Sequence, residues 1–288
     1  MNRRDFVATL AVVPALSAVQ NAQTPRPAPA RSGLKVGTVT YNIARDWDVD
    51  AIIKNLTEIG MDAVELRTTH KHGVELSLSP AQRAEVRKRF EDSPVRIGGL
   101  GTVCEYHAPD QAVVRKNIEE TKAWVALARD IGAPGVKVRP NGLPKEVAEE
   151  KTLEQIGRSL AECGAAAQDA GVKIQLEVHG TGTSRLPRIR KIMDYAGNHP
   201  GVRVCWNSNP TDLLDGGFDA NFALVKDQIG QVHMRDLFDD YPSRALIQAL
   251  VAMKFDGYCF AEIPESADPV RVLKYFTAVF RAHQGLLP

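Results

Sequence analysis

From Lys35 to the C-terminus, short apolar runs rich in β-branched residues alternate with longer segments whose apolar residues recur at helical spacing. This alternation predicts a strand followed by a helix, repeated along the chain. Segments such as EIGMDAVEL, DIGAPGVKV and DAGVKIQLE place a helix-stopping glycine just ahead of the next apolar run. The predicted strands are 35–41, 62–67, 95–101, 135–140, 172–179, 202–207, 231–236 and 258–263.

Eight such units predict a single-domain α/β protein, a (β/α)8 TIM barrel, over residues 31–288. An open doubly wound sheet is the alternative with the same alternation. That fold commonly carries a GxGxxG turn between a strand and a helix, and no predicted strand here is followed by one. The barrel is therefore the predicted fold.

The N-terminal segment has a different character. Arg3 and Arg4 precede Phe6, an apolar run extends to Ala18, and the stretch TPRPAPA follows. The run is too short to span a bilayer but is typical of a signal peptide, and the RRDF pattern resembles a twin-arginine (Tat) export signal of bacteria. A Sec signal or a disordered tail is the alternative. We expect residues 1–30 to be a Tat-type signal with a Pro/Ala-rich linker, and the mature protein to be periplasmic.

Charge and cysteine content exclude several classes of partner and site. The net charge is +1 without a basic stripe, so neither nucleic acid nor, after signal removal, a membrane is an expected partner. The four cysteines show neither CxxC nor metal-finger spacing, which indicates buried thiols rather than a zinc finger. A homo-oligomer is compatible with the sequence.

Polar residues gather where the predicted strands end, and in a TIM barrel the carboxyl ends of the strands carry the chemistry. Five of the seven histidines fall on this rim. A single histidine at such a position is commonly structural, but five on one rim indicate a functional site. In chain order the rim residues are Glu65, Arg67, His70, His72, Glu105, His107, Lys137, Arg139, Glu177, His179, Asn207, Asn209, His233, Arg235, Asp236, Glu262 and Glu265.

Two of these carboxylates, Glu177 and Glu262, lie deep in apolar strands. A carboxylate in a dry barrel mouth needs a cation or strong donors to stay charged. A divalent metal held by Glu177, His233 and Glu262, with Asn207 nearby, would supply that charge. Mixed oxygen and imidazole ligands suit Mn²⁺, Mg²⁺, Co²⁺ or Zn²⁺ and leave positions open for a substrate.

The motifs LEVH, VHMRD and FAEI on strands five, seven and eight resemble the xylose isomerase-like TIM barrels, the sugar phosphate isomerase/epimerase family, over roughly 35–285. The resemblance implies one metal bound by residues of strands five to eight: Glu177, the position of Asn207, His233 and Glu262. It also implies that the two glutamates act as acid and base on opposite faces of a sugar carbon, assisted by His179.

Some of the other rim residues are predicted to contact a small-molecule carbohydrate. The resemblance assigns substrate oxygens to His179 and to Arg235. The remaining predicted substrate contacts are His70, His72, Glu105, His107, Arg139 and Asn209.

Strand six departs from the family pattern. The family has an aspartate there, usually followed by a histidine three residues on, whereas this chain has Asn207 and then Ser208, Asn209 and Pro210. An amide oxygen can coordinate a metal but adds no negative charge. Either the metal is retained with lower affinity, or it is lost and Asn207 binds the substrate.

The expected reaction is metal-assisted isomerisation or epimerisation through an enediolate. Export favours an unphosphorylated sugar or sugar derivative as the substrate. The family also includes lyases that cleave 3-keto-glycosides by β-elimination, which is the alternative reaction. A non-catalytic sugar-binding barrel is the alternative of another class. An endonuclease-IV-like nuclease, with His70 and His107 as metal ligands, is disfavoured by the neutral charge and by Asn207.

Overall fold

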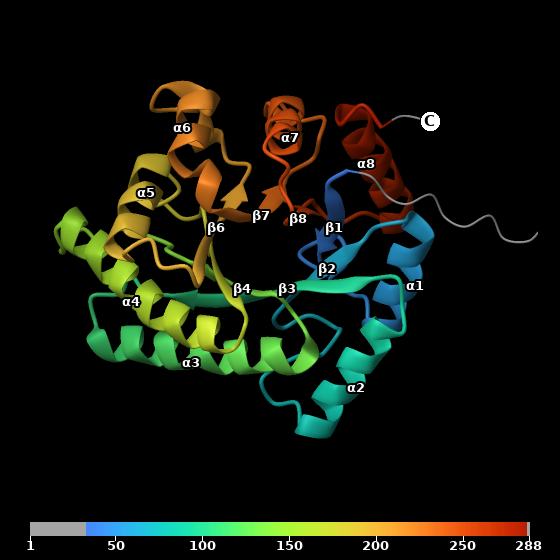
Figure 1. Cartoon of the computed structure of the whole chain (residues 1–288), viewed down its shortest axis with the longest axis horizontal. Helices are drawn as coiled ribbons and strands as arrows, with labels where there is room; N and C mark the ends of the chain where they lie inside the picture. The colour runs from blue at the N-terminus through green and yellow to red at the C-terminus, as the bar shows by residue number, and fades with distance from the viewer. Residues whose placement is uncertain (1–32, 287–288) are drawn as a thin grey trace, which may run out of the picture. The chain divides into compact units, whose positions relative to one another are not determined.

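The structure is a computed structural model that describes residues 33–286. Its eight strands form a closed barrel in chain order, every neighbouring pair is parallel, and β1 pairs with β8 to complete the ring (Figure 1). The strands are β1 (Lys35–Val39), β2 (Ala63–Arg67), β3 (Arg96–Glu105), β4 (Gly135–Arg139), β5 (Lys173–Glu177), β6 (Val202–Asn207), β7 (Ile229–Met234) and β8 (Tyr258–Ala261).

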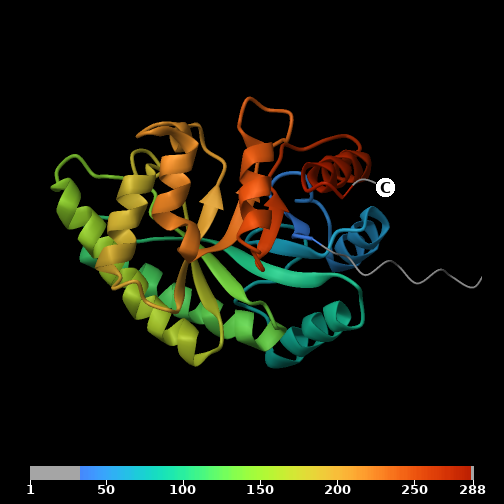
Figure 2. The same cartoon turned by 45° about the horizontal axis from the view of Figure 1, so that its top comes forward.

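One α-helix follows each strand, and the turned view shows the helices arranged around the outside of the strands (Figure 2). The predicted (β/α)8 barrel is confirmed; the predicted signal and linker, 1–30, lie outside the described residues. The helices are α1 (Val49–Ile59), α2 (Pro80–Glu91), α3 (Gln111–Ile131), α4 (Glu149–Asp169), α5 (Leu186–Tyr195), α6 (Gly217–Val225), α7 (Ser243–Ala252) and α8 (Pro269–His283).

The glycines predicted to stop helices do so in the left-handed backbone region. Gly60 after α1, Gly132 after α3 and Gly171 after α4 have φ angles of 81°, 78° and 71°. Glycine adopts this region without the steric cost that a Cβ imposes. Each helix therefore ends at a defined residue, and the following strand enters the barrel at a defined level.

The hydrophobic core lies mainly outside the barrel, between the strands and the helices. Large side chains such as Leu56, Leu127 and Trp206 are fully buried there. The four cysteines are also buried and unpaired, as predicted. Burial of apolar surface stabilises a fold by about 25 cal/mol per Å², so this outer layer is the main source of stability.

The inside of the barrel is mostly polar. Its separate apolar cluster contains only Val39, Ala63 and Phe260, with Tyr258 packed against it. Several charged and amide side chains are buried instead, and those that belong to the site are Glu65, Lys137, Glu177, Gln231 and His233. The interior is therefore available for chemistry, provided that each of these groups finds a partner.

Glycines on β3 provide the space for these inner side chains. A Cβ on Gly98 would lie 2.5 Å from the Phe260 ring, and a Cβ on Gly101 would lie 2.6 Å from Glu65 Oε1. Such contacts are far shorter than van der Waals distance, so these positions must lack a side chain. Phe260 and Glu65 consequently reach across the barrel interior.

Six of the eight strands end at a residue other than the predicted one, and three of these differences concern the site. β3 runs on to Glu105, because Glu105 still pairs in register with Arg139 of β4. β5 and β8 end earlier than predicted, at Glu177 and Ala261. His179 and Glu262 therefore lie just beyond their strands, where side chains can turn over the barrel mouth.

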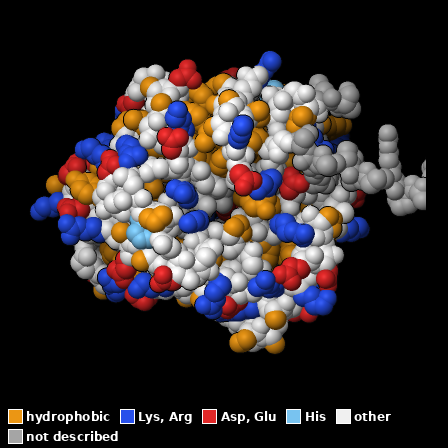
Figure 3. All heavy atoms as spheres, viewed as in Figure 1, with side chains coloured by type: hydrophobic (Ala, Val, Ile, Leu, Met, Phe, Trp, Pro, Cys, Tyr) orange, Lys and Arg blue, Asp and Glu red, His pale blue; other side chains and the backbone are white. Residues whose placement is uncertain are grey.

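The surface carries charged side chains of both signs. On the face shown in Figure 3, basic and acidic side chains are interspersed. Within residues 33–286, no helix combines the length and the apolar composition that a membrane span requires.

A buried acid holds the exit of β6. Asp212 is 0% exposed, and its Oδ2 accepts hydrogen bonds from the Asn209 backbone N–H at 3.0 Å and from the Tyr241 hydroxyl at 2.8 Å. Tyr241 in turn accepts a hydrogen bond from Trp206 Nε1 at 3.0 Å. Burial raises the pKa of Asp212 to about 7 although both hydrogen bonds oppose the shift.

This raised pKa predicts a pH-dependent stability. Because the pKa is higher in the folded than in the unfolded protein, the contribution of Asp212 is full below pH 4 and is lost as the pH rises through about 7. Asp212→Asn should remove this dependence. Between pH 5 and pH 8 the wild type should lose about 2–3 kcal/mol more unfolding free energy than the variant, as measured by urea denaturation.

Asp219→Asn is the matched control, because Asp219 is an exposed acid a few residues further along the chain. Its pH profile should follow that of the wild type. Parallel pH profiles for Asp212→Asn and the wild type would contradict the assignment.

Candidate active site

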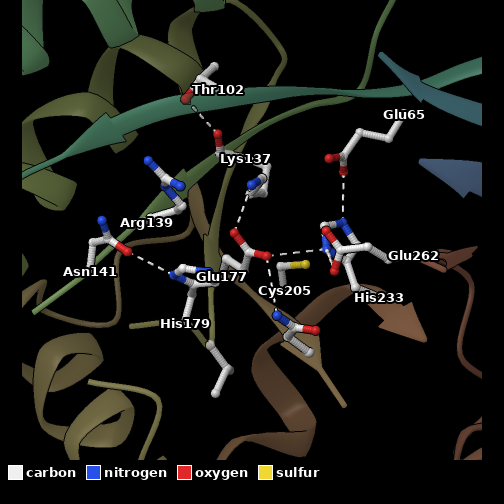
Figure 4. A network of polar contacts seen from close by, with 12 residues as sticks. Glu65, Thr102, Lys137, Arg139, Asn141, Glu177, His179, Cys205, His233 and Glu262 are labelled. Carbon is white, nitrogen blue, oxygen red and sulfur yellow. Dashed lines mark hydrogen bonds and ion pairs between the residues drawn. The ribbon is translucent and has the colours of Figure 1, made fainter. Parts of the chain in front are cut away.

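Glu177, His233 and Glu262 come together in the mouth of the barrel. Each offers one ligand atom, and these atoms all lie within 4.8 Å of one another. His233 Nδ1 is 3.4 Å from Glu177 Oε1 and 3.4 Å from Glu262 Oε2 (Figure 4). Among residues 33–286 no other group of three or more His, Cys, Asp or Glu converges in this way, and neither His70 nor His107 belongs to it.

A third carboxylate, that of Glu65, determines which nitrogen of His233 carries a hydrogen. Glu65 of β2 lies with Oε2 at 3.0 Å from His233 Nε2, so Nε2 carries the hydrogen and donates it. Gln231 also contacts both of these groups. In the neutral ring His233 Nδ1 is then the nitrogen without a hydrogen; it is buried and has no hydrogen-bond partner among the described residues. Its lone pair lies between the two glutamates.

The charge around His233 favours a cation. Burial lowers the pKa of His233, but the acidic groups of Cys205, Glu65 and Glu262 outweigh burial and raise that pKa well above its ordinary value. In the protein alone, these acids therefore draw a second proton to Nδ1. A divalent metal at Nδ1 would take the place of that proton, and the two-carboxylate, one-imidazole donor set suits such a metal.

Lys137 of β4 forms a buried ion pair with Glu177. Its Nζ lies 2.7 Å from Glu177 Oε2, and the two side chains are 8% and 2% exposed. Burial alone would raise the pKa of Glu177 and lower that of Lys137. Their mutual attraction reverses both effects: the pKa of Glu177 is held well below its usual range and that of Lys137 is raised. Both groups are therefore charged.

Asn207, at the end of β6, lies beside the ligand group, which consists of Glu177, His233 and Glu262. Its Nδ2 donates to Glu177 Oε1 at 3.3 Å, the oxygen that also faces His233. Rotation of the Asn207 side-chain amide would place Oδ1 where Nδ2 lies, since amide nitrogen and oxygen occupy equivalent positions. Oδ1 would then face the ligand group. The two ligand glutamates carry two negative charges, and Lys137 cancels one. An aspartate at position 207 would add one negative charge and so offset the charge that Lys137 cancels.

His179 is oriented by a short chain of hydrogen bonds. Its Nδ1 lies 2.8 Å from Asn141 Oδ1, and Asn141 Nδ2 donates to Glu105 Oε2. An amide oxygen only accepts, so Nδ1 carries the hydrogen and Nε2 is unprotonated. Burial and the charges of Lys137 and Arg139 lower the pKa of His179. His179 is therefore a neutral imidazole suited to accept a hydrogen bond or a proton.

A cavity of about 100 Å³ connects these groups. It brings together three of the predicted catalytic residues and one predicted substrate contact, Arg139. It also includes residues to which sequence analysis gave no role. The lining consists of Val39, Tyr41, Glu65, Arg67, Lys137, Arg139, Glu177, His179 and Glu262.

The two histidines after β2 do not line this cavity. His72 is buried, its Nε2 lies 2.8 Å from the Arg67 carbonyl, and its Nδ1 accepts a backbone N–H two residues later. Both nitrogens therefore hold the loop in place. His70 Nδ1 contacts Thr40 Oγ1 at 2.8 Å, and its ring stacks on Tyr41 at 6.2 Å. Burial lowers the pKa of His70 to about 4, so His70 is neutral beside the rim.

Four further predicted contacts also lie outside the lining. Asn209 Nδ2 donates to two backbone carbonyls, of Val178 and Asn207, and so holds the β6 exit. Arg235 pairs with Asp239 at 2.5 Å near the surface. His107 lies against Gly142, and Glu105 acts through Asn141. Asn209 Nδ2 and Arg235 Nε thus have partners within the protein, and direct substrate contact by these two residues stays a prediction.

The sequence pattern could have assigned a role to some of the cavity residues that sequence analysis left without one. Lys137 and Arg139 lie two positions apart on one strand, as do Glu65 and Arg67, so each pair points to the same side of its strand. In a barrel this side is the interior. Asn141 follows β4 without any distinctive pattern, so its hydrogen bond to His179 could not be predicted.

The protein is thus a (β/α)8 barrel, and Glu177, His233 and Glu262 form a carboxylate and histidine site in its mouth. The chain belongs to the xylose isomerase-like TIM barrel family, because the pattern of that family matches residues 53–279. The resemblance found in the sequence is thereby confirmed. No curated protein matches the sequence.

Solved structures with the same fold have low sequence identity to this chain. The 3-keto-D-glucoside 4-epimerase of E. coli is 14% identical, with a TM-score of 0.72 over 86% of this chain and 99% of its own. An L-ribulose 3-epimerase is 16% identical, with a TM-score of 0.74 over 88% and 95%. The IOLI protein, solved with a zinc atom, is 16% identical, with a TM-score of 0.72 over 86% and 98%.

The position of Asn207 predicts the effect of adding a charge. Asn207→Asp should tighten Mn²⁺ binding by on the order of tenfold to a hundredfold, because a third carboxylate would face the cation. Titration calorimetry on metal-stripped protein measures this. Asn198→Asp, in the turn after α5, adds the same charge elsewhere and should leave the affinity unchanged. Unchanged affinity in Asn207→Asp with altered turnover would place residue 207 on the substrate instead.

The ion pair of Lys137 predicts a metal-dependent stability. Lys137→Met leaves Glu177 buried without its counter-charge, which should cost about 3–5 kcal/mol of unfolding free energy in the presence of a chelator. Mn²⁺ should restore more stability to this variant than to the wild type, because the metal would replace the lost positive charge. Thermal and urea unfolding with and without Mn²⁺ measure both effects.

Lys173→Met is the control, since the Lys173 side chain at the start of β5 forms one hydrogen bond among the described residues, to the carbonyl of the exposed Pro200. Metal should stabilise it no more than it stabilises the wild type. An equal loss in Lys137→Met with and without Mn²⁺ would contradict the exchange of lysine for metal.

Proposed function

We propose that the protein is a metal-assisted sugar isomerase or epimerase that acts through an enediolate on an unphosphorylated sugar or sugar derivative. The observation that carries this proposal is the convergence of Glu177 and Glu262 on Nδ1 of His233, which has no hydrogen-bond partner among the described residues. These residues would hold a divalent metal, which when bound polarises a carbonyl and acidifies the neighbouring C–H.

Glu177 and Glu262 differ in how firmly neighbouring side chains hold them. Glu177 is held by Lys137 and by Asn207, and it is nearly fully buried. Glu262 is 22% exposed, lines the cavity and has no donor closer than His233 at 3.4 Å among the described residues. Glu262 is therefore the better placed carboxylate to move a proton at the substrate, and Glu177 the better anchor for a cation.

His179 would complete the proton chemistry. Its Nε2 is unprotonated, its pKa is lowered, and the Asn141 hydrogen bond fixes the ring. A substrate hydroxyl in the cavity could donate to this nitrogen. Proton transfer between adjacent carbons gives isomerisation, and return of the proton to the opposite face gives epimerisation.

The comparisons support the carbohydrate part of the proposal. The proteins with this fold include a 3-keto-D-glucoside 4-epimerase and an L-ribulose 3-epimerase, and the IOLI structure holds a zinc atom. An unphosphorylated substrate fits a periplasmic enzyme, which is the location we propose from the RRDF signal pattern.

β-Elimination from a 3-keto-glycoside is the second candidate. It begins with the same removal of a proton next to a carbonyl. Lys137 and Arg139 line the cavity and would place N–H donors beside an expelled oxygen. Product analysis separates the two reactions, since elimination releases the second sugar and epimerisation does not.

The proposal predicts metal-dependent proton exchange. Ketoses and 3-keto-glycosides incubated in D₂O with Mn²⁺ should gain deuterium next to the carbonyl, as measured by mass spectrometry. Glu262→Gln and Glu177→Gln should each slow this exchange by about 10²–10⁴-fold, since each removes an ionised carboxylate.

Glu265→Gln is the matched control, because Glu265 follows β8 in the same loop but is 75% exposed and faces Arg45. It should exchange at the wild-type rate. If no substrate exchanges deuterium with or without Mn²⁺ while sugars still bind, the protein is a sugar-binding barrel and the proposal is wrong.

A further inference from the structure

Charges are divided across the mouth of the barrel. Glu177, His233 and Glu262 come from β5, β7 and the end of β8, and Glu65 of β2 reaches across to His233. The three cations of the same cavity come from β2 and β4: Arg67, Lys137 and Arg139. Figure 4 shows Lys137 and Arg139 on one side of Glu177, and His233 and Glu262 on the other. A substrate in this cavity therefore meets an acidic, metal-binding side and a basic side.

A glycine opens the space between the basic residues. Gly101 of β3 pairs in register with Arg67 on one side and with Lys137 on the other. A Cβ on Gly101 would lie 3.3 Å from the Arg67 Cα as well as against Glu65. Since no side chain stands between β2 and β4 at this level, their cations face a common space.

The two guanidinium groups are incompletely paired. Arg67 Nη1 donates to the Thr68 carbonyl at 2.8 Å and to Thr69 Oγ1 at 2.9 Å, and the group lies 5.6 Å from the Tyr41 ring. No carboxylate pairs with Arg67 in the described part of the chain. Its Nε and Nη2 are therefore free to donate to a ligand.

Arg139 is also short of partners. Its nearest carboxylate, Glu105, is 3.5 Å away, and its Nε is buried without a hydrogen-bond partner among the residues described. Other arginines near the rim are better paired: Arg188 contacts Glu149 with two nitrogens, at 2.8 and 2.7 Å. A buried N–H without an acceptor is costly, so Arg139 Nε indicates an acceptor that the protein itself does not provide.

We propose that Arg67 and Arg139 form a subsite for a carboxylate of the substrate, which makes the substrate a sugar acid. The reaction of that acid rests on the proposed function; its binding does not. A guanidinium fork matches the two oxygens of a carboxylate. Phosphate sites commonly use backbone N–H groups of glycine-rich turns, whereas the positive charges of this cavity are side chains. A neutral sugar would leave Arg67 without a counter-charge and would add none to the single, 3.5 Å contact of Arg139 with Glu105.

Three probes that differ only at C6 test the subsite: D-tagaturonate, D-tagatose and D-tagatose 6-phosphate. Titration calorimetry is run on the metal-free and on the Mn²⁺-loaded protein. The acid should bind about 10- to 100-fold more tightly than the neutral ketose, and more tightly than the phosphate ester. Equal affinities for acid and neutral ketose, or a preference for the phosphate, would overturn the proposal.

Substitution of the arginines assigns the effect to the subsite. Arg67→Gln and Arg139→Gln should each weaken binding of the acid about tenfold or more and leave binding of D-tagatose unchanged. Arg67→Lys and Arg139→Lys keep the charge but lose the fork, so their affinities for the acid should be intermediate. Arg129→Gln, an exposed position at the end of α3, removes one charge as a control. Equal losses for the acid and the neutral ketose would overturn the subsite.

Deuterium exchange separates this inference from the proposed function. If the acid binds with the expected dependence on arginine but no probe exchanges deuterium with Mn²⁺, the subsite is supported and the proposed reaction is wrong. If D-tagatose exchanges as fast as the acid and neither arginine matters, the subsite is wrong and the proposed reaction is supported.

Discussion

The buried ion pair between Lys137 and Glu177 is the interaction on which the interior of this barrel depends. At 2.7 Å and almost without solvent, neither charge could persist alone. The pair keeps a carboxylate ionised at the centre of the mouth in the absence of any metal. Because the hydrophobic core lies outside the strands, the fold can carry this polar interior without losing its main source of stability.

The same pair also affects how a cation would be held. Lys137 occupies one oxygen of Glu177, while Asn207 and His233 face the other. With an amide at position 207 and a lysine beside the ligands, the site has less negative charge than one built from three carboxylates. A weaker hold on a cation leaves that cation more electron-poor, which favours polarisation of a bound carbonyl. In this arrangement a lower affinity for the metal would thus accompany a stronger polarisation of the substrate carbonyl.

The fold could be predicted from the sequence because its signals are local. Periodic apolar residues and helix-stopping glycines such as Gly60 and Gly132 need no tertiary partner to be recognised. The ligand group could also be predicted, since parallel strands bring their carboxyl ends together whatever the details of packing. His233 and Glu262 met as their strand positions required.

The roles of single rim residues could not be predicted in the same way. Whether a histidine or arginine is free for a substrate depends on which backbone groups lie near it. His72 Nε2 contacts the Arg67 carbonyl and Arg235 Nε donates to Asp239, whereas Arg139 has a buried Nε without a partner among the described residues. Such differences arise from loop geometry, and the residue types at the strand ends do not reveal them.

The division of charge gives the proposed chemistry a direction. A sugar acid with its carboxylate on Arg67 and Arg139 would have its other end towards Glu177 and His233, with His179 as a third contact beside them. Three different contacts distinguish one orientation of a chiral substrate from its reverse. Glu262, the glutamate without a lysine, would then face a defined carbon from a defined side. An enzyme that changes one stereocentre among several needs such a constraint, and here it follows from the strands that carry the cations and the strands that carry the ligands.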